Sequence, residues 1–325
     1  LGILIGQLMA ASIIVMFMDE LIQKGWGLGS GISLFIACGV SQQILWSLFS
    51  PLPAGDGGSI GIIPFIIQNI QLGMGDFADV FFRSNQLPSI FGLLLTVGVL
   101  LILIYTQGMK VEIPIVSTKY RGFAATYPIK LMYVSNIPVI LASALTANAL
   151  FIGQMLWSQL NPRNASPLFN ILAQYDPTSP GTPIGGIVYY ITPPRGLDLL
   201  ALDPLRGVLY VLFMIGIVVV FGKLWVELGG LSSKKAAQNL LDADVVIPGF
   251  RRSNKPVEML LNKYIPSVTI LGSVILGLIA GVSDILGVFG SGIGILLTVD
   301  ILINYYNQLV REKVEMVMPR LGAWL

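Results

Sequence analysis

Long apolar runs alternate along the chain with shorter polar segments. A helix that crosses roughly 30 Å of hydrocarbon needs about 17–25 mainly apolar residues, and seven runs have about that length. They cover residues 1–18, 31–48, 89–105, 137–156, 208–226, 267–282 and 285–303. The pattern predicts an all-α fold, a polytopic membrane helix bundle that forms a single membrane domain over residues 1–325.

The polar segments between the runs are expected to lie alternately on the two sides of the membrane. The larger ones are residues 50–88 and 157–205 on one side, and residues 107–136 and 228–266 on the other. A tight turn at residues 281–284 is expected to join the last two runs. Residues 60–72 are apolar but short and interrupted by Pro64, so we expect them to lie along the membrane surface.

Basic residues are distributed very unevenly between these two sides. One side holds 15 of the 19 lysines and arginines, at positions 24, 110, 119, 121, 130, 223, 234, 235, 251, 252, 255, 263, 311, 313 and 320. The other side holds the remaining 4, at positions 83, 163, 195 and 206. Because basic loops stay in the cytoplasm, the C-terminus is predicted to be cytoplasmic and Leu1 to lie near the outer surface. The two basic loops, 107–136 and 228–266, are then cytoplasmic, and 50–88 and 157–205 are extracytoplasmic.

Composition supports a membrane protein and excludes several kinds of chemistry. Charged residues make up 11% of the chain, apolar residues 54%, and the mean hydropathy is +0.80. The chain has no histidine, which excludes histidine proton relays, histidine-ligated metals and a Ser-His-Asp triad. The one cysteine, Cys38, cannot form an intrachain disulfide. No nucleotide-binding loop or metal site is present, so we expect no enzymatic activity, no catalytic residue, no metal and no cofactor.

A glycine-rich stretch at residues 25–31, GWGLGSG, lacks the spacing of a dinucleotide-binding loop. Glycines lack a Cβ atom and let helices approach each other closely in membranes. We therefore expect these glycines to let the next helix start tightly against its neighbours.

Asp300 interrupts the final apolar run. A carboxylate at bilayer depth costs roughly 2.5–3.5 kcal/mol on insertion scales, so it should face water or a partner. Two interpretations remain open: a structural pairing inside the bundle, for example with Asn304 one turn on, or a group that lines an aqueous vestibule.

Two basic clusters project from the inner loops: Lys119, Arg121 and Lys130 in one, and Arg251, Arg252 and Lys255 in the other. Arg121 and the Arg251 pair lie far from the nearest span, which suits an acidic partner such as nucleic acid phosphates. Charge alone leaves a second interpretation open, in which the clusters orient the protein and attract anionic lipids.

Several stretches resemble one known family. They are 19–20 (DE) with 29–36 (GSGISLFI), 109–114 (MKVEIP), 120–122 (YRG), 127–130 (YPIK), 133–140 (YVSNIPVI), 248–251 (PGFR) and 294–299 (GILLTV). Together they resemble the SecY family, the α subunit of the protein-conducting channel. The loops are more similar to its archaeal and eukaryotic branch than to the bacterial one.

The resemblance implies a channel of ten spans in two pseudo-symmetric halves around an hourglass pore. The seven spans here would be the fourth to the tenth: residues 1–50 carry the last two spans of the N-terminal half, and residues 89–325 form the C-terminal half. We therefore expect a fragment that lacks the first three spans, in line with its lack of an initiator methionine.

The resemblance also implies roles for individual residues. The pore ring maps to Ile32, Ile36, Ile140 and Leu297, all bulky aliphatics. A narrow collar of such side chains dewets and blocks ions. Ile32 and Ile36 share a helix face, although spacing alone would suggest lipid contact or packing.

Three further groups of positions follow from the resemblance. Thr146 and Asn148 would be polar positions of the lateral gate. Asp300, one turn from Leu297, would line the cytoplasmic funnel, which favours the vestibule interpretation. The ribosome-docking positions would be Lys119, Arg121, Arg251, Arg252 and Lys255.

The expected function is that of a multi-pass cell-membrane channel subunit that passes unfolded polypeptides and releases transmembrane segments laterally into the bilayer. Expected partners are small SecE/γ-type and β-type membrane subunits, the ribosome, signal peptides, nascent polypeptides and the lipid bilayer. The alternatives are a secondary transporter of small solutes and a seven-helix receptor. A transporter should concentrate ionisable groups at midplane, whereas Asp300 is the only acid well inside a span.

Overall fold

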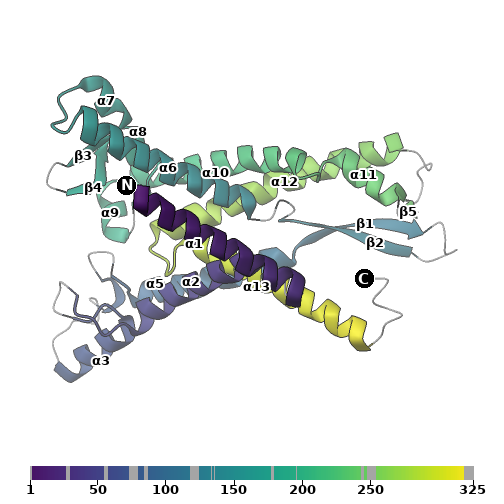
Figure 1. Ribbon diagram of the computed structural model, residues 1–325, viewed down its shortest axis with the longest axis horizontal. Helices are drawn as coiled ribbons and strands as arrows, with labels where there is room; N and C mark the ends of the chain where they lie inside the picture. Colours follow the sequence, from purple (N-terminus) through teal and green to yellow (C-terminus); the bar gives the residue numbers. More distant parts are fainter. Residues whose placement is uncertain are drawn as a thin grey trace. The chain divides into compact units, whose positions relative to one another are not determined.

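The computed structural model describes residues 2–26, 30–54, 58–72, 80–83, 87–117, 124–132, 134, 136–176, 179–194, 196–242, 245–246 and 254–317. The chain divides into two compact units. Unit 1 comprises Leu1–Asp76 and Gly294–Leu325, and unit 2 comprises Phe77–Ile293. Figure 1 labels their helices and strands.

The described part of unit 1 is mainly helical, with one isolated antiparallel β-bridge between Pro53 and Ser59. Its described elements are α1 (Gly2–Leu21), the π-helical turn η1 (Ile22–Trp26), α2 (Gly31–Phe49), α3 (Ile62–Leu72) and most of α13 (Gly292–Val317). The apolar helix α3 is too short to cross a membrane, as the segment around Pro64 predicted.

Unit 2 combines long helices with short helices and two small antiparallel sheets. Its helices are α5 (Ile90–Gly108), α6 (Ile137–Leu160), α7 (Pro167–Leu172), α8 (Ile187–Tyr190), α9 (Leu197–Leu202), α10 (Pro204–Leu228), α11 (Ser233–Asp242) and α12 (Asn254–Ile285). Its strands are β1 (Lys110–Ser117), β2 (Ala124–Lys130), β3 (Gln174–Asp176), β4 (Ser179–Gly185) and β5 (Val245–Val246). One sheet has the order β2-β1-β5, and the other pairs β3 with β4.

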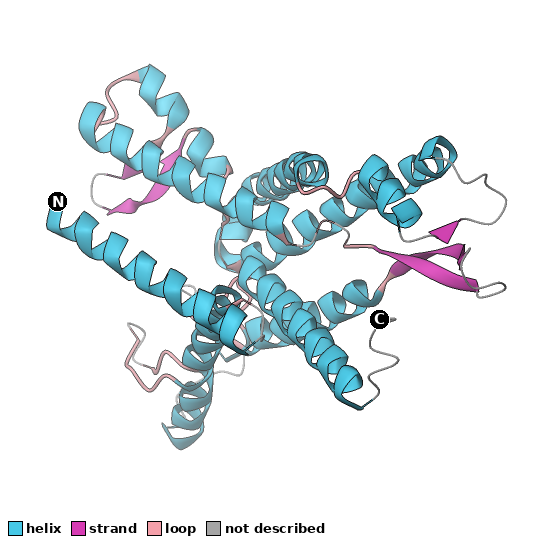
Figure 2. Cartoon of the chain, turned by 45° about the vertical axis from the view of Figure 1, so that its right-hand side comes forward, coloured by secondary structure: helices cyan, strands magenta, loops and turns pink. Residues whose placement is uncertain are grey.

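Seven helices in the described part of the chain are long and apolar enough to cross a membrane. They occur in the predicted order, so the predicted all-α polytopic bundle is confirmed. Within unit 2, the two sheets lie at opposite ends of the long helices (Figure 2).

Helices α10 and α12 lie side by side along unit 2 and approach each other closely (Figure 1). The contact uses Ser273, Gly277 and Gly281, small residues spaced one turn apart on α12. A Cβ atom on Gly277 would lie 2.8 Å from the Cα atom of Ile215 on α10. Small residues at this spacing let two backbones touch, which provides van der Waals attraction where lipid offers no hydrophobic driving force.

The turn between the last two spans differs from the prediction. Residues 281–284 are helical and belong to α12, and the chain reverses over Leu286–Ser291 before α13 starts at Gly292. The prediction of a turn at 281–284 was wrong because the real turn is apolar. Val288 and Phe289 are buried in it, so hydropathy assigned them to a span.

A buried carboxylate holds this turn. Asp284 is only 8% exposed. Its Oδ1 atom accepts a hydrogen bond from the backbone N–H of Gly292 (2.9 Å), and its Oδ2 atom accepts one from the Tyr210 hydroxyl on α10 (3.1 Å). The N–H of Phe289 donates to Thr96 Oγ1 on α5 (3.0 Å). These bonds tie α5, α10 and α12 to the start of α13.

The basic loop segments contain structure that hydropathy did not predict. Residues 107–136 include the β1–β2 hairpin, in which Lys110 pairs with Lys130, and β5 pairs with the far end of β1. Much of 228–266 is helical, because it contains α11 and because α12 starts at Asn254 rather than near residue 267.

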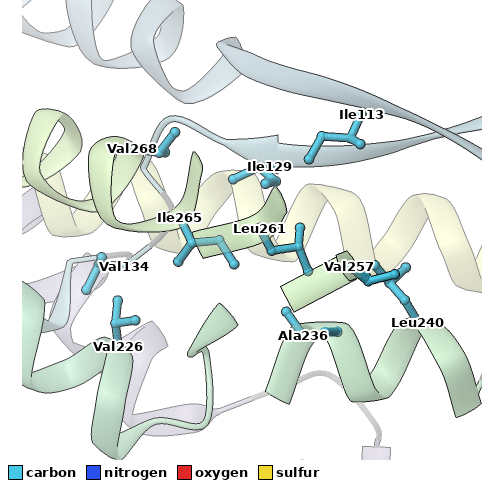
Figure 3. Packing of buried hydrophobic residues seen from close by; sticks show 11 residues of the cluster. Ile113, Ile129, Val134, Val226, Ala236, Leu240, Val257, Leu261, Ile265 and Val268 are labelled. Atoms are coloured by element: carbon cyan, nitrogen blue, oxygen red, sulfur yellow. The ribbon is translucent and has the colours of Figure 1, made fainter. Parts of the chain in front are cut away.

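A hydrophobic core connects these segments (Figure 3). Its buried side chains are Ile113 and Ile129 from the hairpin, Val134, Val226 at the end of α10, Ala236, Ala237 and Leu240 from α11, and Val257, Leu261, Ile265 and Val268 from α12. Val257, Leu261 and Ile265 recur every fourth residue, and polar residues such as Glu258, Asn262 and Lys263 lie between them. This amphipathic stripe buries one helix face without making a continuous apolar run.

The other end of unit 2 has a smaller core formed by Trp157, Ala173, Tyr175 and Val188. The Trp157 indole N–H donates to Asn164 Oδ1 (2.8 Å), and the Tyr175 hydroxyl donates to the carbonyl oxygen of Leu150 (3.2 Å). Burial raises the pKa of the Tyr175 hydroxyl above its ordinary value.

Replacing Asp284 with alanine tests the role of the buried carboxylate. Asp284→Ala removes the acceptor of two hydrogen bonds, and we expect it to lower the free energy of unfolding by about 2–4 kcal/mol. The matched control is Asp198→Ala, at an exposed site in the first turn of α9, for which we expect a loss below about 1 kcal/mol. The measurement is thermal unfolding in detergent. Equal unfolding temperatures for both variants would contradict this role.

Candidate functional site

The predicted ring residues Ile32 and Ile36 lie one turn apart near the start of α2. Their side chains are 42% and 38% exposed. Within α2 only Gly31 and Ala37 are buried. The isoleucine pair therefore presents an aliphatic face that the rest of the described structure leaves partly uncovered.

The start of α2 explains the glycine at position 31. A Cβ atom there would lie 2.8 Å from Ile22 Cδ1 and 3.4 Å from Asp19 Oδ1. Glycine at this position lets α2 begin close to the end of α1 without displacing the Ile22 side chain. The prediction of a tight helix start is confirmed at Gly31, while residues 27–29 of the same stretch lie outside the described residues.

Leu297 and Asp300 lie on the part of α13 that belongs to unit 1. Both are partly buried, next to Leu296 and Val299, which are buried. Their three-residue spacing puts them on neighbouring faces of the helix, as the sequence predicted. The funnel role of Asp300 stays a prediction.

Ile140 lies in the first turn of α6 and belongs to unit 2. Its N–H donates to the carbonyl oxygen of Asn136 (3.1 Å), and Pro138 occupies the first turn, where the missing N–H is tolerated. Ile140 is 38% exposed, although its neighbour Val139 is fully buried. The helix therefore packs through one face and leaves Ile140 on another.

The entry into α6 is fixed by the hairpin and by α12. The N–H of Leu131 donates to the carbonyl oxygen of Met109 (2.9 Å), which closes the base of the hairpin. The carbonyl oxygen of Leu131 lies so near α12 that a Cβ atom on Gly272 would stand 2.3 Å from it. This close contact sets the position from which α6 carries Ile140.

The two predicted gate positions on α6 differ in their surroundings. Thr146 is buried, and its hydroxyl donates to the carbonyl oxygen of Ala142 in the same helix (2.9 Å). Asn148 is exposed. Its carboxamide is therefore the more available of the two for a contact with another helix.

Of the predicted docking residues, Lys119, Arg121, Arg251 and Arg252 lie outside the described residues. Lys255 is exposed in the first turn of α12. The ammonium group of Lys110, at the base of the hairpin, forms an ion pair with the carboxylate of Glu112 (Nζ to Oε1, 2.8 Å). Among the residues that the structure describes, no group of three or more His, Cys, Asp or Glu side chains is placed to hold a metal ion.

The ring residues fall in both units. Ile32, Ile36 and Leu297 belong to unit 1, as does Asp300, whereas Ile140 belongs to unit 2 together with Thr146, Asn148 and Lys255. The ring of all four aliphatic side chains stays a prediction. Its members in each unit are aliphatic side chains that packing leaves at least partly uncovered.

The family model and the relatives that match this chain point to one protein family. Residues 1–306 match the model of the SecY family. The protein translocase subunit SecY of Pyrococcus horikoshii is 41% identical over 98% of this chain and 67% of its own length. The chain thus spans about two thirds of the length of the relatives it matches.

Solved structures of similar sequence share the fold. A SecY structure, from a study of how its plug domain stabilises the closed state of the translocation channel, superposes with a TM-score of 0.75 at 36% identity. It is covered over 66% of its length, against 95% of this chain. Sec61 in the canine ribosome–channel complex from the endoplasmic reticulum gives 0.70 at 35% identity, with 95% of this chain and 65% of that chain covered.

Adding a methyl group at Gly272 tests how α6 is positioned. Gly272→Ala forces a Cβ atom against the carbonyl oxygen of Leu131, and overpacking of this kind costs about 1–3 kcal/mol. We expect a lower unfolding temperature in detergent. The matched control is Gly216→Ala on α10, where an added Cβ atom meets nothing within 4 Å, and stability should stay equal or rise slightly. Gly272→Ala with wild-type stability would rule out the close contact.

Proposed function

This chain belongs to the SecY family, and we propose that it forms the pore of a protein-conducting channel. It would pass unfolded polypeptides across the membrane and release transmembrane segments sideways into the bilayer. The observation that carries the proposal is the match to SecY over nearly the whole chain, together with the shared fold of solved channels. The comparisons give no support to a secondary transporter.

The protein is a multi-pass membrane protein, and we propose that its C-terminus is cytoplasmic. The uneven charge distribution supports this orientation. The pairing of β5 with β1 also supports it, because it brings residues 245–246 to the hairpin of 110–130 and so joins the two basic loops at one end of unit 2. The β3–β4 sheet at the opposite end would then face outward (Figure 2).

In this proposal Ile32, Ile36, Ile140 and Leu297 form the narrowest part of the pore. An aliphatic collar excludes water when it is closed, so ions meet a barrier without any charged group. A passing polypeptide can widen the collar and finds no polar group to bind it. The uncovered aliphatic faces at Ile36 on α2 and Ile140 on α6 support these roles.

Lateral release would depend on a balance between lipid partitioning and polar contacts in the gate. About ten leucine-class residues in a signal helix gain roughly 3–6 kcal/mol on entering lipid. Each interhelical hydrogen bond in a membrane contributes only about 0.6 kcal/mol. A strongly apolar segment therefore opens the gate and a weakly apolar one does not. The exposed carboxamide of Asn148 suits this contact better than Thr146, whose hydroxyl is bonded within α6.

We further propose that the ribosome docks on the basic loops, through Lys119, Arg121, Arg251, Arg252 and Lys255. The similar canine Sec61 occurs in a ribosome–channel complex, and basic side chains suit the phosphates of ribosomal RNA. SecE/γ-type and β-type subunits, signal peptides and nascent chains are the other proposed partners. The channel would have no catalytic activity of its own, and Asp300 would line its cytoplasmic funnel.

Ion conductance in planar bilayers tests the ring. Ile36→Asn or Ile140→Asn should raise closed-channel conductance, because keeping an aliphatic side chain out of water is worth about 1.5–3 kcal/mol, which corresponds to roughly ten- to hundredfold in rate. The control is Leu34→Asn, on the opposite face of α2 and also exposed. Wild-type conductance in both ring variants, or an equal leak in the control, would refute the ring assignment.

Signal-sequence selectivity tests the gate. Asn148→Leu removes a polar contact of about 0.6 kcal/mol, so segments less apolar by roughly one to two leucines should now insert. Thr146→Val should leave the threshold nearly unchanged, because its hydroxyl does not leave its own helix. The measurement is the inserted fraction for a series of segments of graded hydrophobicity. An unshifted threshold in Asn148→Leu would remove this residue from the gate.

A further inference from the structure

A polar junction lies directly beside the ring residues of unit 1. Asp19, near the end of α1, accepts two hydrogen bonds at its Oδ1 atom: one from the Ser30 hydroxyl (3.1 Å) and one from the backbone N–H of Ile32 (3.0 Å). Its Oδ2 atom accepts a third from the Gln23 carboxamide (2.8 Å). A carboxylate of one helix thus binds the backbone of a predicted ring residue in the next.

The first turn of α2 needs this carboxylate. Helix N-termini leave backbone N–H groups without partners inside the helix and carry a partial positive charge. The first turn of α2 contains no acidic residue. The Ser30 hydroxyl accepts a hydrogen bond from the N–H of Ser33 (3.4 Å), and Asp19 supplies both the negative charge and the acceptor for Ile32.

The same junction reaches the helix that carries Leu297. The Tyr305 hydroxyl on α13 donates to the carbonyl oxygen of Ser30 (2.6 Å). Tyr305 lies about two turns after Leu297 along α13. Ser30 therefore contacts Asp19 through its side chain and Tyr305 through its backbone, so α1, α2 and α13 meet at one residue.

We propose that Asp19 and Tyr305 are positioning residues for the pore ring. They fix the start of α2 and hold α13 against it, which sets the height and rotation of Ile32, Ile36 and Leu297. A shift of α2 by one residue would rotate its faces by about 100° and turn Ile32 and Ile36 away from the proposed pore. The inference rests on the proposed channel function and deepens it, because it names what holds the ring in place.

Three substitutions in the full-length protein, assembled with its membrane partners, test the proposal. Tyr305→Phe removes one hydroxyl without changing the ring, and Asp19→Ala removes the carboxylate. Loss of one neutral hydrogen bond shifts an equilibrium by about two- to tenfold, so closed-channel ion leak should rise by that factor in Tyr305→Phe and by more in Asp19→Ala. Asp19→Asn keeps an oxygen acceptor and should leak less than Asp19→Ala.

The matched controls are Tyr306→Phe, next in sequence and exposed on α13, and Glu20→Gln, next to Asp19 and paired with Lys24. Leak in planar bilayers is measured beside the unfolding temperature of each variant. We expect Tyr305→Phe and Asp19→Ala to leak and the two controls to stay tight. The unfolding temperature of Tyr305→Phe should equal that of the wild type.

Other outcomes overturn the proposal in distinguishable ways. Tight channels in Tyr305→Phe and Asp19→Ala, with a leak in Ile36→Asn, would reject positioning and leave the ring intact. If the leak of every variant, controls included, simply followed its loss of unfolding temperature, the junction would stabilise the fold without positioning the ring. If Ile36→Asn did not leak, the ring assignment would be wrong, and the positioning role of Asp19 and Tyr305 would be wrong as well.

Discussion

The structure depends on one constraint: lipid tails are as apolar as the side chains of the helices. Burying leucine against leucine inside a membrane therefore gains little, and helices must be placed by polar bonds and close backbone contacts. The chain meets this constraint at helix ends and at small residues. Asp284 ties α10 and α12 to the first residue of α13, and Gly277 lets α12 touch the backbone of α10. Asp19 plays the corresponding part in unit 1, where it binds the start of α2.

Weak attraction between apolar side chains also suits a pore that must close to ions and widen around a polypeptide. The proposed ring residues are aliphatic, so they attract one another only weakly and exclude water rather than bind it. What holds them lies outside the ring. Ile140 is carried by a helix whose entry is clamped between the hairpin and Gly272, and Ile32 donates its own N–H to Asp19.

Much of this organisation could be predicted from sequence because hydrophobic runs have the length of a bilayer. The spans, the shared face of Ile32 and Ile36, and the close helix start at Gly31 follow from spacing and side-chain size alone. The hairpin was missed because Val111, Ile113 and Ile115 alternate with other residues over too few positions to stand out in a basic loop. The turn at Leu286–Ser291 was missed because it is apolar. The first turns of α12 were missed because only one face of the helix is apolar there, which does not make a continuous apolar run. Asp19 appeared only as part of a family motif, because its bonds to Ser30 and Ile32 reach the start of α2, beyond the range of local patterns.

Cross-linking to a stalled translocating polypeptide shows whether the four proposed ring residues surround one point of the pore. In a Cys38→Ser background, single cysteines replace Ile32, Ile36, Ile140 or Leu297, and Leu34 on the opposite face of α2 serves as the control. A single cysteine is moved along the polypeptide. We expect all four ring positions to cross-link within the same short segment of the polypeptide, and Leu34→Cys not to cross-link there. Cross-links at Leu34→Cys equal to those of the ring, or ring positions that meet the polypeptide far apart along its length, would contradict the proposed ring.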